Sequence, residues 1–99
     1  MKVEKIRFLL EAAGDLDSGY RFYDTHSAGL GKYFVDTLLG EIESLYIYAG
    51  IHRKEFGFYR LLSRRFPYAV YYDFQGATAI IVAILDLRRN PSWIKSRLE

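Results

Sequence analysis

Tyr59 to Tyr72, with the sequence YRLLSRRFPYAVYY, and Ile80 to Pro91, with the sequence IIVAILDLRRNP, decide the fold of this 99-residue chain. Both stretches are dense in β-branched and aromatic residues, which is typical of β-strands. Together they hold five of the nine arginines of the chain, and the second ends in Arg-Arg-Asn-Pro. Neither a plain core nor a plain solvated face explains this combination of tyrosine and arginine. We therefore expect a surface with a further role.

The second half of the chain is predicted to form an antiparallel meander. Pro67 cannot donate to a strand ladder and should separate the first strand from the second, and Gln75-Gly76 should form the next turn. The three predicted strands are Phe56 to Ser63, Tyr68 to Phe74 and Ala77 to Leu87.

Two amphipathic helices are predicted before the strands. Apolar residues recur every three or four positions from Leu9 to Tyr23 and again from Leu30 to Leu45. Gly50 marks the end of the second helix, so the two helices form an antiparallel hairpin. The opposite face of the first helix is predicted to carry the charged residues Asp15, Asp17, Arg21 and Asp24.

The two ends of the chain complete the predicted architecture. Val3 to Leu9 is either an edge strand or the lead into the first helix. At the other end Asn90-Pro91 should end the sheet, and Ser92 can cap a short helix through Leu98. The sequence therefore predicts an α+β fold, with a helical hairpin packed on the meander, in a single domain spanning residues 1–99.

The last predicted strand is apolar on both faces. One hairpin can cover only one face of the sheet, and the terminal helix is too short to cover the other. We therefore expect apolar sheet surface, framed by tyrosines and arginines, to be left for a partner. The alternative is that the terminal helix and the tyrosines close this surface themselves. The strict alternation of a strand places Ile80, Val82 and Ile84 on one face and Ile81, Ala83 and Leu85 on the other.

The composition favours a soluble cytoplasmic protein. The chain has no cysteine, which excludes disulfides and thiolate metal sites and favours a reducing compartment. Its longest apolar run, Ala77 to Leu85, is far shorter than the roughly 20 residues that span a bilayer. His26 and His52 fall at loop or cap positions without a recognisable second ligand, so we expect them to be exposed. We expect no metal, no cofactor and no membrane contact.

The net charge of +2 conceals an asymmetry between the two halves. Residues 1–49 carry five basic and eight acidic residues, a net charge of −3, while residues 50–99 carry nine basic and four acidic residues, a net charge of +5. The second half is therefore the expected contact for an anionic partner.

Several short patterns in the chain resemble the RelE/ParE superfamily of toxins from bacterial type II toxin–antitoxin systems. Each pattern is weak alone, but their order and spacing from about Ile6 to Pro91 are similar to that family, in particular to ParE-like toxins of the plasmid stabilisation type. The patterns are Glu11-Ala12-x-x-Asp15-Leu16, Tyr23, Gly29-Leu30-Gly31-x-x-Phe34, Tyr59-Arg60, Arg65-Phe66-Pro67-Tyr68, Tyr71-Tyr72 and Asp86-x-Arg88-Arg89-Asn90-Pro91.

The resemblance implies a β-α-α-β-β-β order, here followed by the short terminal helix. It also implies a cytoplasmic toxin that a small cognate antitoxin neutralises by wrapping the sheet and helices with its C-terminal segment. RelE-like members cut messenger RNA on the ribosome, and ParE-like members poison DNA gyrase. Which target applies here must be inferred from individual residues of this sequence.

A RelE-like ribonuclease needs a cation near the scissile phosphate and a group that moves protons. In that subfamily a tyrosine or histidine near the C-terminus commonly helps with the proton transfer, but no His, Tyr or Cys follows Tyr72 here. Phenols are poor bases because their pKa is about 10. The remaining candidates are Arg60, Arg64 and Arg88 for the charge, and Tyr72, Tyr68 or Tyr71 for the proton transfer.

These observations favour a toxin that binds its target without cleaving it, with DNA gyrase as the expected target. The chain has only five lysines for phosphate contacts, and its long helical hairpin is similar to that of ParE. The alternatives are a ribosome-dependent messenger RNA endoribonuclease and a non-toxic relative that still binds an antitoxin. Direct binding of nucleic acid stays open.

The residues expected to contact the target or the antitoxin are Arg60, Arg64, Arg65, Tyr71, Arg88, Arg89 and Trp93. The alternative for the strand arginines is a solvated face. Asp86 with Arg88 or Arg89 could instead form a structural pair that holds the turn.

Overall fold

The computed structural model describes residues 2–99. Its elements are β1 (Lys5–Phe8), α1 (Leu10–His26), α2 (Leu30–Glu43), α3 (Leu45–Tyr48), β2 (Lys54–Glu55), β3 (Phe58–Leu62), β4 (Tyr68–Gln75), β5 (Thr78–Asp86) and α4 (Pro91–Leu98). The α+β class, the helical hairpin, the three-stranded meander and the terminal helix are confirmed. The second helix of the hairpin, predicted to end at Gly50, is divided at Ser44 into α2 and α3. Val3 to Leu9 contains an edge strand, which was one of the two readings of that segment. No helix among residues 2–99 is long and apolar enough to cross a membrane.

The five strands lie in the order β1-β5-β4-β3-β2. β3, β4 and β5 are antiparallel neighbours, while β1 pairs in parallel with β5. β2 is a two-residue strand that the sequence did not predict, and it pairs with the start of β3. The predicted strand from Phe56 therefore begins later, at Phe58, because Phe56 and Gly57 form the turn between β2 and β3.

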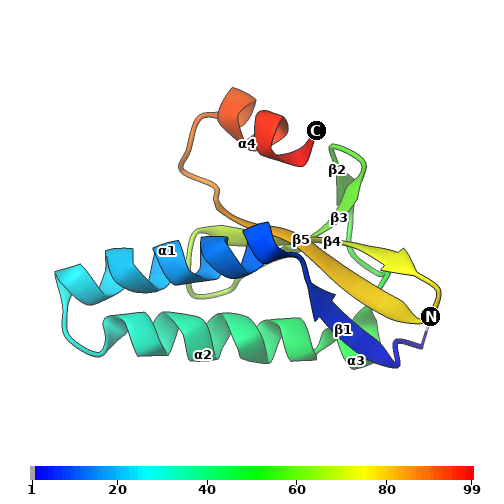
Figure 1. The fold of residues 1–99 in the computed structure, drawn as a ribbon, viewed down its shortest axis with the longest axis horizontal. Coiled ribbons are helices and arrows are strands. Elements are labelled where there is room, and N and C mark those ends of the chain that lie inside the picture. Colours follow the sequence, from blue (N-terminus) through cyan, green and yellow to red (C-terminus); the bar gives the residue numbers. More distant parts are fainter. Residues whose placement is uncertain (1) are drawn as a thin grey trace.

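Helices cover both faces of the sheet. Figure 1 shows α1 and α2 on one side of the sheet and α4, in red, on the other. On the hairpin side the buried cluster includes Phe34 and Leu38 from α2, together with Tyr72 from β4. On the α4 side Ile94 and Leu98 pack on the opposite face of the same strands.

The alternation of side chains along β5 differs from the prediction. The register shifts between Tyr71 and Tyr72 of β4, so that β5 carries one extra residue, Val82. Such a β-bulge reverses which residues face each side beyond it. The hairpin side of β5 therefore carries Ala79, Ile81 and Ile84, and the α4 side carries Ala83 and Leu85.

The apolar sheet surface that we expected to stay open is covered by α4. Ala69, Tyr71, Ala83 and Leu85 are each no more than 1% exposed. Eight helical residues suffice because two of these four side chains are alanines, which let the helix approach the sheet closely. The prediction of uncovered apolar sheet surface was therefore wrong for β4 and β5, whereas Leu62 of β3, opposite Ala69 on the same face, is 51% exposed. The most exposed large apolar side chains are Leu10, Ile47, Tyr48, Ile51 and Leu62.

The cap of α4 is Asn90 and not Ser92. The Asn90 side chain accepts a hydrogen bond from the Ser92 N–H at 2.8 Å, and Pro91 occupies the first helical position. Proline is favoured there because the first N–H of a helix has no intrahelical partner. The Asn-Pro pair therefore both ends the sheet and begins the helix.

Candidate functional site

A cleft of about 350 Å³ lies between α1, the end of β5 and α4. We call it the β5 cleft. It brings together side chains that are distant in the sequence and holds several of the residues singled out above. Its lining includes Asp15, Phe22, Asp86, Arg89, Trp93 and Arg97.

Asp15 links the three elements around the cleft. Its Oδ2 accepts the Ile84 N–H of β5 at 3.0 Å, and its two oxygens lie 2.8 Å from the two terminal nitrogens of Arg97 on α4. Ile84 lies beyond the end of the β1–β5 pairing, so its N–H has no strand partner on that side. The Asp15 side chain is only 11% exposed. Asp15 was predicted together with Asp17, Arg21 and Asp24 on the face opposite the apolar residues, but the unpaired strand edge and α4 enclose it.

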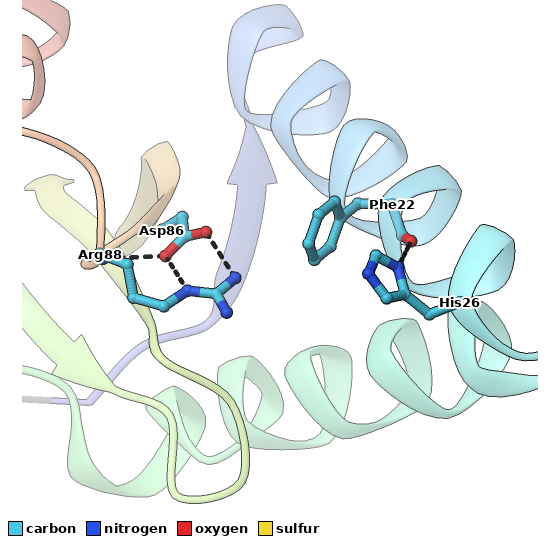
Figure 2. A network of polar contacts seen from close by, with 4 residues as sticks. All are labelled: Phe22, His26, Asp86 and Arg88. Atoms are coloured by element: carbon cyan, nitrogen blue, oxygen red, sulfur yellow. Dashed lines mark hydrogen bonds and ion pairs between the residues drawn. The ribbon is translucent and has the colours of Figure 1, made fainter.

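Asp86 and Arg88 hold the turn that follows β5. One Asp86 oxygen accepts the Arg88 N–H and Nε–H at 2.9 and 3.0 Å, and the other accepts from Nη2 at 2.8 Å (Figure 2). Burial acts to raise the pKa of the Asp86 carboxyl, but the hydrogen bonds and charge of Arg88 outweigh it and hold that pKa below its usual value. The structural pair that the sequence suggested for this turn is therefore present.

Arg88 also faces the C-terminal turn of α1. Its guanidinium carbon lies 5.6 Å from the centre of the Phe22 ring, and the ring of His26 packs on Phe22 at 4.6 Å between ring centres. His26 Nδ1–H donates to the Phe22 carbonyl at 2.8 Å, which fixes the imidazole at the helix end (Figure 2). Arg88 is thus oriented from both sides, by a carboxylate and by an aromatic ring.

Arg89 and Trp93 form the exposed side of the cleft. The Arg89 guanidinium carbon lies 3.8 Å from the centre of the Trp93 ring, and that of Arg97 lies 5.6 Å from it. Arg97 is paired with Asp15, whereas Arg89 has no ion pair within residues 2–99. The Trp93 ring therefore sets the orientation of an exposed cation at this side of the cleft.

The other predicted contact residues lie elsewhere. Arg60 is on the α4 side of the sheet, opposite Tyr71 and 4.0 Å from Glu55. Arg64 and Arg65 lie in the β3–β4 loop over α2, where the Arg64 N–H donates to Glu41 at 2.8 Å and an Arg65 Nη donates to Tyr33 Oη at 2.9 Å. Arg89 and Trp93 line the β5 cleft, and Arg88 lies against Phe22 of its lining. The lining does not include Arg60, Arg64 or Arg65.

Tyr71, which was predicted to contact a partner, is buried in this structure. The side chain lies under α4 and is 1% exposed. Burial raises the pKa of Tyr71, although the charge and hydrogen bonding of Arg60 act in the opposite direction. This phenol therefore packs in the core between the sheet and α4.

The residues that were candidates for a ribonuclease site do not all lie on the same face of the sheet. Tyr72 is fully buried and faces the hairpin side of the sheet, whereas Arg60 faces the α4 side. Burial raises the pKa of Tyr72 and raises that of Tyr68 to about 12. Arg60 and Tyr72 therefore cannot act on one phosphate in this arrangement.

His52 is half-buried against Tyr72, which corrects the expectation that it is exposed. The Tyr72 oxygen accepts the Gly50 N–H at 2.9 Å and contacts His52 Nδ1. We assign the Tyr72 O–H as donor to a neutral His52 Nδ1, which gives both groups a partner. Burial lowers the pKa of His52, in agreement with a neutral ring.

This contact predicts a pH dependence of stability. Since the pKa of His52 is lower in the folded chain than in the unfolded chain, the unfolded state binds more protons below about pH 6.5, and stability falls as the pH falls. In His52→Asn, the amide oxygen can replace Nδ1 as acceptor but does not titrate. Urea unfolding between about pH 5.5 and 7.5 should show a steeper loss in the wild type than in the variant. Parallel pH profiles for the two proteins would contradict this assignment.

Sequence reasoning missed two residues of the site, Asp15 as a tertiary link and Arg97 as its partner. Asp15 was part of a recognised pattern, but nothing in that pattern indicated its role. No sequence spacing connects the two residues, which lie 82 positions apart.

The comparisons with known proteins agree with the fold implied by the resemblance. No protein-family model matches the sequence, and no curated protein matches it. Among solved structures, a chain described as "Chromosomal ParDE TA system from P. aeruginosa" is similar at a TM-score of 0.77 and 22% sequence identity. The similarity covers 84% of this chain and 95% of the other. The two chains therefore share a fold.

Proposed function

We propose that this chain is the toxin of a type II toxin–antitoxin system, neutralised by a cognate antitoxin in the bacterial cytoplasm. We further propose that it arrests growth by binding a target, DNA gyrase, rather than by cleaving RNA. The observation that carries the first proposal is the fold shared with a chain of a ParDE system at a TM-score of 0.77.

The arrangement of the cleft supports a binding role. Arg89 is exposed, stacks on Trp93 and has no carboxylate partner among residues 2–99, so it can pair with an acidic group of a partner at little cost in side-chain entropy. The buried tyrosines, by contrast, have raised pKa values and offer no ready base for RNA cleavage.

Induced expression tests the proposal. The wild-type chain should arrest growth of a bacterial host while primer-extension mapping finds intact transcripts. Normal growth at high expression would contradict a toxin. Growth arrest with cleaved transcripts would contradict the proposal of gyrase binding and support the ribonuclease alternative.

Neutralising Arg89 should weaken the arrest. In Arg89→Gln the cation beside Trp93 is lost while the buried core is unchanged, and we expect the intracellular concentration needed for arrest to rise about tenfold, the effect of losing a good interface contact. Lys32→Gln is the matched control, because Lys32 is an exposed cation on α2 that pairs with Asp36. If Arg89→Gln and Lys32→Gln arrest growth equally, at equal expression measured by immunoblot, Arg89 does not contact the target.

A further inference from the structure

The turn between β2 and β3 contains a strained phenylalanine. Phe56 and Gly57 connect two paired strands, and both have positive φ angles, 54° and 87°. This is the signature of a type I′ hairpin turn, whose first position strongly favours Asn, Asp or Gly. Phe56 is the one non-glycine residue with positive φ in residues 2–99. A bulky side chain in this region is a genuine outlier that costs stability.

Nothing inside the fold accounts for this choice of residue. The Phe56 side chain is 41% exposed and belongs to neither buried cluster. The aromatic pairs formed among residues 2–99 do not include it, although the neighbouring Tyr59 stacks on Tyr72. An asparagine would relieve the strain without removing a core contact, so the aromatic ring is not explained by folding.

The surroundings of Phe56 are basic. Arg53 and Lys54 are exposed just before the turn, and Lys54 lies 4.8 Å from the Tyr59 ring centre. Glu55 is the only acidic residue from Arg53 to Arg60, and it lies 4.0 Å from Arg60. The hairpin lies at the edge of the sheet, on the side away from α2 (Figure 1). The turn therefore presents one partly exposed apolar ring on a two-residue loop, beside the exposed cations Arg53 and Lys54.

We propose that Phe56 is an anchor that inserts into an apolar pocket of the target, with acidic side chains around that pocket facing Arg53 and Lys54. This inference rests on the proposed toxin function and adds a second contact, separate from the β5 cleft. Aromatic anchors that enter a partner's pocket are typical hot spots of interfaces, and a tight turn holds such an anchor at low entropic cost. The strain at Phe56 is then a stability cost retained for binding.

The decisive variant is Phe56→Asn, because it separates folding from binding. Asn-Gly is the preferred type I′ pair, so the melting temperature should rise by about 4 °C. Loss of the ring should at the same time raise the intracellular concentration needed for growth arrest at least about tenfold. Phe56→Tyr keeps the ring and should arrest growth like the wild type. Tyr46→Ala is the matched control at another exposed aromatic, since Tyr46 is 43% exposed, and it should also retain the arrest.

The outcomes distinguish this inference from the function on which it rests. If the wild type does not arrest growth, the toxin proposal fails and the anchor fails with it. If the wild type arrests growth and Phe56→Asn arrests it equally at equal expression, only the anchor is overturned. Equal loss in Phe56→Asn and Tyr46→Ala would also overturn it, because the effect would then belong to exposed aromatic surface in general.

Discussion

Asp15→Ala should lower the free energy of unfolding by about 3 kcal/mol, the scale of breaking a buried ion pair, and the melting temperature by more than about 10 °C. The substitution removes the acceptor of the Ile84 N–H and both contacts to Arg97. Arg97 is then left mostly enclosed without its carboxylate, and α4 loses its polar link to α1. Urea unfolding followed by circular dichroism measures the change.

The control for Asp15→Ala is Asp17→Ala on the same helix. Asp17 pairs with Arg21 at 3.0 Å, but both side chains are more than half exposed. Exposed pairs of this kind contribute little, so the change should stay below about 0.5 kcal/mol. If the two variants are equally stable, Asp15 does not hold the three elements together.

Gly31→Ala should destabilise the helical hairpin by about 2 kcal/mol, the cost of inserting a methyl group into a close contact. A Cβ atom at Gly31 would lie 2.5 Å from the Tyr20 carbonyl oxygen and 2.9 Å from the Asp24 Cβ. The first of these atoms belongs to the backbone of α1 and cannot rotate away, so α1 and α2 would have to separate.

Gly40→Ala is the matched control in the same helix. A Cβ atom at Gly40 meets nothing within 4 Å. Since alanine is the better helix former, this variant should gain between about 0.5 and 1 kcal/mol. Thermal unfolding of the two variants should therefore give shifts of opposite sign. Two shifts of the same sign would contradict the close approach at Gly31.

The elements that the sequence predicted are those with a strong local pattern. From Leu30 of α2 to Leu45 at the start of α3 the apolar residues recur at helical spacing, and Phe34, Leu38 and Ile42 are buried as that spacing requires. No such pattern indicates the bulge at Val82. The residues around it are all apolar, so both possible registers would place apolar side chains on both faces of the sheet. The cover provided by α4 was missed because it depends on the small size of Ala69 and Ala83, which bring the helix close.

The candidate site was predictable only where its residues are close in the sequence. Arg88, Arg89 and Trp93 follow one strand and necessarily lie together. Arg60 and Tyr72 belong to adjacent strands, but the pairing of β3 with β4 places their side chains on opposite faces of the sheet. Which residues share a face depends on the register of this pairing, and the register cannot be predicted from the sequence. Asp15 and Arg97 meet only because α1 and α4 both pack on β5, so no local signal could have joined them.

The most direct test of the central claim is the supercoiling activity of purified DNA gyrase, measured while the purified chain is added. A toxin that binds gyrase through exposed cations and an aromatic anchor predicts a loss of supercoiling at the concentrations that arrest growth, with Arg89→Gln and Phe56→Asn each needing about tenfold more protein. Full supercoiling activity at those concentrations would contradict it.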